Sequence, residues 1–239
     1  MLHYLKGHIM IKAAAFDLGG TLVNYPLYWR SLYRHALETA AQNCGISMTE
    51  EMFTAAYDIR MKYNTRANPR EHEVTSDVIF TEILTAWSCH ADTESIKVAF
   101  FSFFNADAAP FPEAREALLR LKQSNIKTGI LTDAAYGMDN KFVLQSISEL
   151  SGLIDFFVSS VDAGYRKPHS AGYLKLLEYF AVSPNEMLYI GDEEKDIIGA
   201  SKLGIISVLI DRSNTQNDFG QNYTANSLND VQRIVESLY

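Results

Sequence analysis

The sequence contains little cysteine, and it has no long apolar run. Cys44 and Cys89 are the only cysteines among 239 residues, and they form no CxxC spacing. So few cysteines exclude a disulfide framework and favour a reducing compartment, most simply the cytoplasm. Because no apolar run approaches the ~20 residues that cross a bilayer, we expect neither a membrane-spanning segment nor a membrane partner.

Positive charge is also scarce. Lys and Arg number 21 against 29 Asp and Glu, which gives a formal net charge of -8. Since nucleic acids and anionic membrane surfaces need a basic patch, neither is an expected partner. The start of the chain, "MLHYLKGHIMIKAAAF", is a weak secretory signal, because His8 and Lys12 interrupt its apolar part and a strand pattern follows at once. We interpret Met1 to Met10 as a short leader.

The remaining composition is typical of a globular protein with a substantial core. Hydrophobic residues make up 47% and charged residues 21% of a chain long enough for one large domain or two small ones. After a first strand that ends on Asp17, the second half of the chain alternates apolar runs with helical patterns. This alternation predicts an α/β fold with a parallel sheet covered on both faces. The later strands are expected at 127–132, 155–160, 187–192 and 205–210.

Residues 24–107 follow a different pattern. They contain one helical pattern after another and no convincing strand, and Thr49 is a candidate N-cap for the second helix. A segment of ~80 residues has the size of a domain. We therefore expect a helical domain at 24–107, inserted into an α/β core made of residues 1–23 and 108–239. Proline occurs at both junctions, as a pair of hinges would require.

Polar side chains stand where the expected strands end. Asp17, Thr132 and Asp192 each close a strand pattern, and Lys167 follows another. Parallel sheets place ligands outside the carboxyl ends of their strands. Two carboxylates there repel unless a cation lies between them, and oxygen ligands of this kind suit Mg²⁺. With Mg²⁺ and Lys167 screening its charge, a carboxylate can attack a phosphoryl group.

Each of these residues also has an ordinary structural explanation. An Asp at the end of a strand commonly caps a turn, and a Thr there usually packs. Asp192 and Asp196 in "GDEEKD" would also suit the first turn of a helix, where acids favour the macrodipole. Their order along the chain and their common edge are what favour a site.

Four segments, in order, resemble the motifs of the haloacid dehalogenase superfamily. They are "AAAFDLGGTLV", "GILTD", "SSVDAGYRKPHSAGY" and "LYIGDEEKDIIGASKLG", and the helical segment lies where a C1-type cap is inserted after the first motif. The resemblance covers almost the whole core. It implies a hydrolase, most simply a phosphatase, with a Rossmann-like core of strand order 5-4-1-2-3.

The resemblance also implies roles for individual residues. Asp17 would be the nucleophile that becomes an aspartyl-phosphate, Thr132 would bind the transferring phosphate, and Lys167 would hold it against Asp17. Phosphate binding would fall to Gly20, Thr132, Asp133 and Lys167. Mg²⁺ would be held by Asp17, the carbonyl of Gly19 and Asp192, with Asp196 orienting water or supporting the ligands. The implied substrate is a small phosphorylated metabolite.

Gly19 departs from the phosphatase pattern, which has a second Asp at this position. That Asp protonates the leaving group and then activates water, and such a group typically contributes ~10²–10⁴-fold. Three readings stay open. The protein is a weak or specialised phosphatase, or it performs dehalogenase or phosphonate chemistry (the latter using Lys62), or it is a non-catalytic phosphate-binding or regulatory protein.

Two segments of the helical region carry further expectations. Residues 58–72 are the most basic part of the chain and either favour an anionic substrate or form a solvated helix face, the more common case. The apolar run "VAFFSFFN" at 98–105 must pack, either within the chain or against a second copy in a homodimer.

Overall fold

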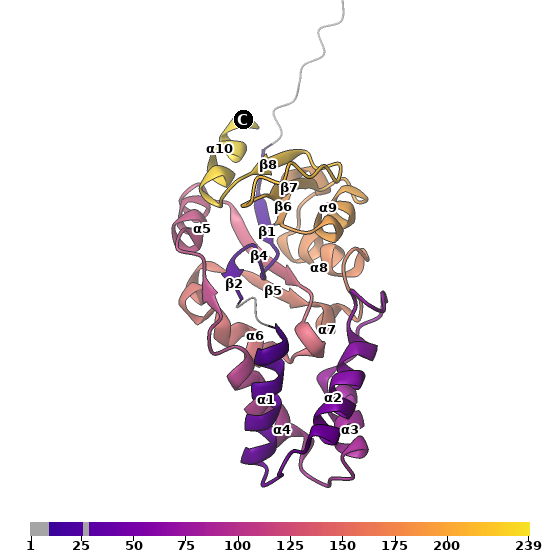
Figure 1. Ribbon diagram of the computed structural model, residues 1–239. Coiled ribbons are helices and arrows are strands. Elements are labelled where there is room, and N and C mark those ends of the chain that lie inside the picture. Colours follow the sequence, from indigo (N-terminus) through magenta and orange to yellow (C-terminus); the bar gives the residue numbers. More distant parts are fainter. Residues whose placement is uncertain (1–9, 26–28) are drawn as a thin grey trace, which may run out of the picture.

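The computed structural model describes residues 10–25 and 29–239, so the leader lies outside the described residues except for Met10. A parallel sheet occupies one end of the molecule and a group of helices the other (Figure 1). In the described residues the sheet has six strands in the order β5-β4-β1-β6-β7-β8. They are β1 (Ala13–Phe16), β4 (Lys127–Thr132), β5 (Phe156–Ser159), β6 (Met187–Gly191), β7 (Ile206–Ile210) and β8 (Tyr223–Ala225).

The predicted α/β fold is confirmed. Taken in chain order, the first five strands of the sheet lie as 5-4-1-2-3, with every pairing parallel. β8 was not predicted: it adds a sixth strand beside β7. It is only three residues long and lies in a polar stretch, so it has no apolar run to reveal it.

Helices cover both faces of the sheet, because alternate residues of each strand point to opposite sides. In β1, Ala14 and Phe16 pack in the same core as the helices α5 and α10, whereas Ala13 and Ala15 pack with α8 and α9. The helices and short 3₁₀ turns of this part are α5 (Ala114–Gln123), η1 (Ala135–Gly137), α6 (Asn140–Ser146), η2 (Ser148–Leu153), α7 (Ser160–Ala163), α8 (Ala171–Phe180), η3 (Pro184–Glu186), α9 (Glu194–Ser201) and α10 (Asn229–Ser237).

Between β1 and β4 the chain forms a helical insert, which we define as α1 to α4. Two-residue strands, β2 (Val23–Asn24) and β3 (Ala109–Pro110), pair antiparallel where the chain enters and leaves it. The insert projects away from the sheet (Figure 1). The predicted domain boundaries at 23/24 and 107/108 stay a prediction. The helices are α1 (Trp29–Asn43), α2 (Glu50–Tyr63), α3 (Ser76–Ala86) and α4 (Thr93–Phe104).

The aromatic residues of the insert pack in the same hydrophobic core as one face of the sheet. Thr49 caps α2 as predicted, accepting a hydrogen bond from the Met52 N–H. Phe100, Phe101 and Phe104 of the apolar run are each at most 1% exposed within this single chain. These rings contact Tyr136 of η1 and Phe142 of α6 as well as the other helices of the insert. The run therefore packs within the chain, and the homodimer stays a prediction. Within the described ranges, no helix is both long and apolar enough to cross a membrane.

Candidate active site

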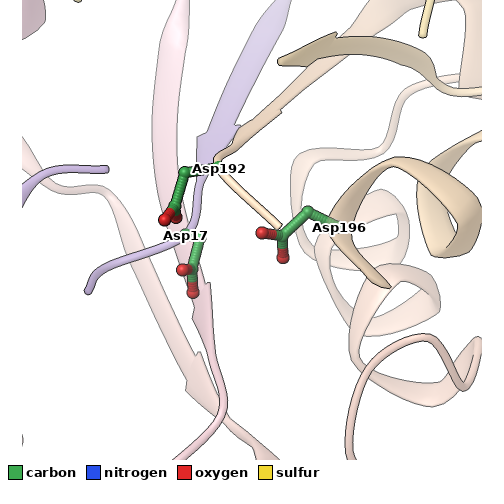
Figure 2. Close-up of side chains that lie close together, drawn as sticks. All are labelled: Asp17, Asp192 and Asp196. Atoms are coloured by element: carbon green, nitrogen blue, oxygen red, sulfur yellow. The ribbon is translucent and has the colours of Figure 1, made fainter. Parts of the chain in front are cut away.

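Three aspartates converge at the carboxyl ends of β1 and β6. Asp17 follows β1, Asp192 follows β6, and Asp196 lies in the first turn of α9. One carboxylate oxygen from each lies within 4.8 Å of the others. Figure 2 shows the three carboxylates gathered in one place. Asp17 and Asp192 are 175 positions apart in the sequence, and they meet because β1 and β6 are neighbours in the sheet.

Lys167 joins two of these aspartates. Its Nζ lies 2.6 Å from Asp17 Oδ1 and 2.6 Å from Asp196 Oδ1, and all three side chains are buried. The Nζ also lies 3.3 Å from the hydroxyl of Tyr189, which itself donates to the carbonyl of Leu131 at 2.9 Å. The ammonium is therefore fixed on three sides beneath the end of the sheet.

The site holds more negative than positive charge. Burial raises the pKa of Asp192 to about 7, and the carboxylates of Asp17 and Asp196 add to the rise. Burial also raises the pKa of Asp196 to about 6, although the Lys167 ammonium opposes this. Burial alone would lower the pKa of Lys167, but Asp17 and Asp196 outweigh it and hold that pKa well above its usual value. Three carboxylates against one ammonium leave a formal surplus of two negative charges.

This arrangement fits a divalent cation. The converging donors are all carboxylate oxygens, the ligands that Mg²⁺ prefers, and the charge of Mg²⁺ equals the surplus. Asp192 is held in place by Thr21, whose hydroxyl donates to its Oδ1 at 2.9 Å. Gly20 approaches it closely as well: a Cβ on that residue would lie 2.2 Å from Asp192 Oδ2. No contact of the Gly19 carbonyl tests its predicted role as a ligand.

The other two predicted phosphate-binding residues lie beside the aspartates. Thr132, at the end of β4, and Asp133 line a cavity of about 380 Å³ together with Asp17, which we call the Asp17 cavity. The carboxylate of Asp133 accepts a hydrogen bond from the Lys167 N–H at 3.0 Å and pairs with Lys195 Nζ at 3.0 Å. Because a carboxylate repels a phosphate, only the backbone N–H of Asp133 would serve the predicted role.

The space beside Gly19 is bounded by an aromatic ring. A Cβ on Gly19 would lie 3.4 Å from Cε2 of Tyr25. Tyr25 lines the Asp17 cavity together with Phe104, Met138 and Val143. Carboxylates of Asp133, Asp192 and Glu193 line the same cavity. Within the described residues, however, a Cβ on Gly19 would have only Tyr25 within 4 Å.

The insert contacts the site through a loop that the sequence did not single out. Glu73 lies between α2 and α3. Its side chain is only 2% exposed, and it accepts hydrogen bonds from Arg166 and from the Ser160 hydroxyl. Its backbone N–H donates to the carbonyl of Gly164 at 3.0 Å. These contacts fasten the insert to the segment that carries Lys167.

Sequence reasoning missed Tyr189, Lys195 and Glu73. Tyr189 had a signal, because its hydroxyl is the one polar side-chain group in the strand "MLYIG" and a buried hydroxyl needs a partner. Lys62, considered for phosphonate chemistry, lies on the exposed side of α2, where its Nζ pairs with Glu82 at 2.7 Å. It does not line the Asp17 cavity.

Comparison with known proteins gives consistent matches. The family model "haloacid dehalogenase-like hydrolase" matches residues 11–204. Glyceraldehyde 3-phosphate phosphatase of Methanocaldococcus jannaschii is 28% identical over 241 residues, covering 96% of this chain and 99% of that protein. Ribulose-1,5-bisphosphate 5-phosphatase of Halopiger xanaduensis is 27% identical over 213 residues, covering 85% of this chain and 86% of that protein. A solved 2-haloacid dehalogenase from Pseudomonas syringae has a TM-score of 0.69 at 20% identity, covering 96% of this chain and 100% of its own, which concerns the fold alone.

Proposed function

This chain belongs to the haloacid dehalogenase-like hydrolase family, and we propose that it is a Mg²⁺-dependent phosphatase that acts on a small phosphorylated metabolite through an aspartyl-phosphate at Asp17. The observation that carries the proposal is the contact of Lys167 Nζ with both Asp17 and Asp196, beside Asp192. The phosphatase names of the two curated relatives support the reaction class.

In the first step, a carboxylate oxygen of Asp17 attacks the phosphorus of the ester. A bond forms between that oxygen and phosphorus while the ester P–O bond breaks, and the leaving group departs with the electron pair. Lys167 holds Asp17 Oδ1, which fixes the orientation of the carboxylate and screens its charge from the phosphate. In the second step, water attacks the aspartyl-phosphate, which releases inorganic phosphate and restores the carboxylate.

Other groups of the chain would bind the transferring phosphate. Thr132, Asp133 and Gly20 line the Asp17 cavity. The Thr132 hydroxyl and the backbone N–H of Asp133 would donate to the phosphate, whereas the Gly20 N–H already donates to the carbonyl of Val23 at 2.9 Å, so Gly20 would contribute close approach rather than a hydrogen bond. Asp17, the Gly19 carbonyl and Asp192 would hold Mg²⁺, with Asp196 behind them. When bound, Mg²⁺ neutralises the negative charge that phosphate and carboxylates bring together.

Gly19 sets the preference for the leaving group. No side chain at this position can give the leaving oxygen a proton, and the neighbouring surface is the ring of Tyr25. Leaving groups that need no proton, such as aryl or acyl phosphates, should therefore be cleaved fastest. Hydrolysis of the aspartyl-phosphate should be slow for every substrate, because the Asp that would activate the attacking water is absent from position 19.

The alternatives have less support. Phosphonate chemistry would need a lysine in the cavity to form an imine, and Lys62 is exposed and paired with Glu82. Dehalogenases of this family use no metal, so dehalogenase chemistry gives no role to the convergence of Asp192 and Asp196 beside Asp17. A non-catalytic phosphate-binding protein would keep the same donors, so only a turnover assay separates it from an enzyme.

The test is phosphate release from 4-nitrophenyl phosphate with and without Mg²⁺. We expect turnover that requires Mg²⁺ and falls to background in Asp17→Asn, while the control Asp107→Asn, an exposed Asp after α4, keeps it. After an acid quench, mass spectrometry should find one added phosphoryl group on the peptide that contains Asp17. Equal turnover by Asp17→Asn and wild type would refute the proposal, and Mg²⁺ binding without any turnover would favour the non-catalytic reading.

A further inference from the structure

A second cavity, of about 300 Å³, adjoins the Asp17 cavity and is strongly basic. We call it the Arg60 cavity. The two cavities share lining residues, so they are neighbours at the contact between the insert and the sheet. The shared residues are Arg66, Asp133, Ala135 and Lys195. The basic residues that line the Arg60 cavity are Arg60, Arg66, Arg70, Arg166 and Lys195.

Four of these five cations are paired with carboxylates. Glu193 pairs with Arg66 at 2.7 Å and with Lys195 at 2.6 Å. Glu73 pairs with Arg166, and with Arg70 at 3.3 Å. Asp133 adds a third carboxylate, 3.0 Å from Lys195 Nζ. Each of these four cations therefore has a carboxylate partner, although three carboxylates against four cations leave the group with one surplus positive charge.

Arg60 is the exception. It lies on α2 and is only 8% exposed, yet in the described part of the chain it forms no salt bridge with a carboxylate oxygen at 4.0 Å or less. Its Nε donates to the Tyr136 hydroxyl and its Nη1 contacts the Met61 sulfur at 3.7 Å. The guanidinium also lies 5.0 Å from the ring centre of Tyr33 and 5.3 Å from that of Tyr57. Within the described residues, its Nη2 makes no hydrogen bond.

An arginine in this environment is costly. A guanidinium stays charged in proteins, so it cannot avoid the cost of burial by losing its proton. Aromatic rings and one hydroxyl offset part of that cost, but they leave the charge itself without a counterion. A second donor in the same cavity is also unsatisfied, because the buried Nε of Arg70 has no hydrogen-bond partner. Two guanidinium donors therefore lack acceptors in one basic cavity.

We infer that Arg60 binds a second anionic group of the substrate, a carboxylate or a phosphate, on the side away from the transferring phosphate. This inference rests on the proposed function. A ligand whose phosphate lies at Asp17 would extend past the shared residues into the Arg60 cavity, where its other anion supplies the missing counterion. Arg60 thereby selects small phosphate esters with two anionic groups over esters with one.

Tyr136 places the guanidinium that makes this contact. It has φ = +53°, in the left-handed region that is unfavourable for a residue with a side chain, within the turn η1 that follows Asp133. Its hydroxyl accepts the hydrogen bond from Arg60 Nε, and its ring lies 5.6 Å from the guanidinium carbon. Tyr136 is a positioning residue, because it acts on the anion through Arg60.

The test compares three esters that differ only at the far end. They are 2-phosphoglycolate with a carboxylate, ethylene glycol bisphosphate with a phosphate, and ethylene glycol monophosphate with a neutral hydroxyl. For Arg60→Met we expect KM to rise about 10- to 100-fold for whichever anionic ester is preferred, since a hydrogen bond to a charged group is lost. KM for the neutral ester, and kcat for 4-nitrophenyl phosphate, should change less than about threefold. Arg60→Lys, which keeps the charge, should recover part of the loss.

The control is Lys62→Met, on the same helix but exposed and outside the Arg60 cavity, which should leave all three KM values near wild type. Circular dichroism checks that each variant is folded. Calorimetric titration of the same esters into Mg²⁺-loaded protein gives the comparison without turnover, so it decides the role of Arg60 even if the proposed hydrolysis fails. An equal effect of Arg60→Met on the charged and neutral esters, or no effect on either, would overturn the inference and leave the phosphatase proposal standing.

Discussion

The ring of Tyr25 lies against Gly19: its Cε2 is 3.4 Å from where a Cβ on Gly19 would stand. That separation is an ordinary van der Waals contact, so a Cβ at position 19 meets the ring without overlapping it. The ring in turn borders the Asp17 cavity. Position 19 therefore has room for the Cβ of an added acid.

Gly19→Asp should raise the hydrolysis of alkyl phosphates. The new carboxyl would protonate the leaving oxygen and activate water, and because its placement beside Tyr25 is not optimised we expect about 10-fold in kcat/KM rather than the full ~10²–10⁴. 4-Nitrophenyl phosphate, whose leaving group needs no proton, should gain less in the first step. Steady-state kinetics on glycerol phosphate and 4-nitrophenyl phosphate measure both.

Gly19→Ala is the matched control, since it adds the same Cβ contact with Tyr25 without an acid. It should not raise turnover of either ester. If Gly19→Asp folds and gives no gain on the alkyl ester, another group already supplies the proton. If Gly19→Ala gives the same gain as Gly19→Asp, the effect comes from moving Tyr25 and not from acid catalysis.

Gly20→Ala should weaken Mg²⁺ binding in addition to lowering stability through backbone strain. Gly20 has φ = +80°, and a Cβ there would meet Asp192 Oδ2 at 2.2 Å. Gly45→Ala is the control, because Gly45 has φ = +72° but nothing within 4 Å of its Cβ position. Both variants should lose ~1–2 kcal/mol from the left-handed conformation, which is about 2–8 °C in Tm for a chain of this size.

Only Gly20→Ala should also lose the Mg²⁺-induced rise in Tm, because the displaced Asp192 can no longer share the cation with Asp17. Thermal unfolding in EDTA and in Mg²⁺ separates the two effects. A Mg²⁺ response retained in full by Gly20→Ala would mean that Asp192 is not a ligand.

Removal of metal should change stability in a way that depends on pH. Folding raises the pKa of Asp192 from 3.8 to about 7 and that of Asp196 to about 6, chiefly through burial. Between about pH 4 and pH 7 the folded state therefore binds more protons than the unfolded state. The stabilisation that these two carboxyl groups give the metal-free protein is complete below about pH 4, and it is lost as the pH rises to about 7. Mg²⁺ competes with the same protons, and the rise in Tm that it causes should be larger at about pH 8 than at about pH 5.

Asp192→Asn isolates this effect. It removes one titrating group, so the EDTA form should become more stable than wild type at about pH 8 and lose part of its pH dependence, while its response to Mg²⁺ disappears. Asp107→Asn should behave as wild type. A Mg²⁺-induced rise in Tm of equal size at both pH values would contradict the role given to Asp192.

The sequence predicted those features that depend on local pattern. The apolar runs that became β4 and β6 end on Thr132 and just before Asp192, and parallel pairing with β1 was enough to bring them to Asp17. The short strands β2, β3 and β8 had no apolar run to reveal them. The place of Tyr25 against Gly19 depends on how the insert docks, and the Glu73–Arg166 contact joins residues 93 positions apart in two loops. Neither relation leaves a periodic signal in the sequence.

The burial of Arg60 is another feature that the sequence alone does not predict. The sequence leaves two roles for the basic segment 58–72, contact with an anionic substrate or, more commonly, a solvated helix face, and Lys62 and Arg66 are exposed. Arg60, two positions before Lys62 on α2, is buried among tyrosines. Helical periodicity separates the two side chains onto different faces, but the sequence alone does not say which face meets the sheet.

Glu73→Gln should destabilise the protein and lower kcat together. The side chain of Glu73 is buried and accepts hydrogen bonds from Arg166 and the Ser160 hydroxyl, and the neighbouring backbone joins Glu71 to Arg166, next to Lys167. Loss of its charge leaves Arg166 with a weaker acceptor in a dry contact, at a cost of ~1–3 kcal/mol, or about 2–12 °C in Tm. Because Lys167 follows Arg166 directly, a looser contact should also disturb the ammonium that orients Asp17.

The control is Glu82→Gln, whose exposed pair with Lys62 contributes little to stability. Thermal unfolding and kcat for 4-nitrophenyl phosphate, measured well below Tm, test both effects, and a normal kcat in a destabilised Glu73→Gln would show that the contact holds the insert without positioning Lys167.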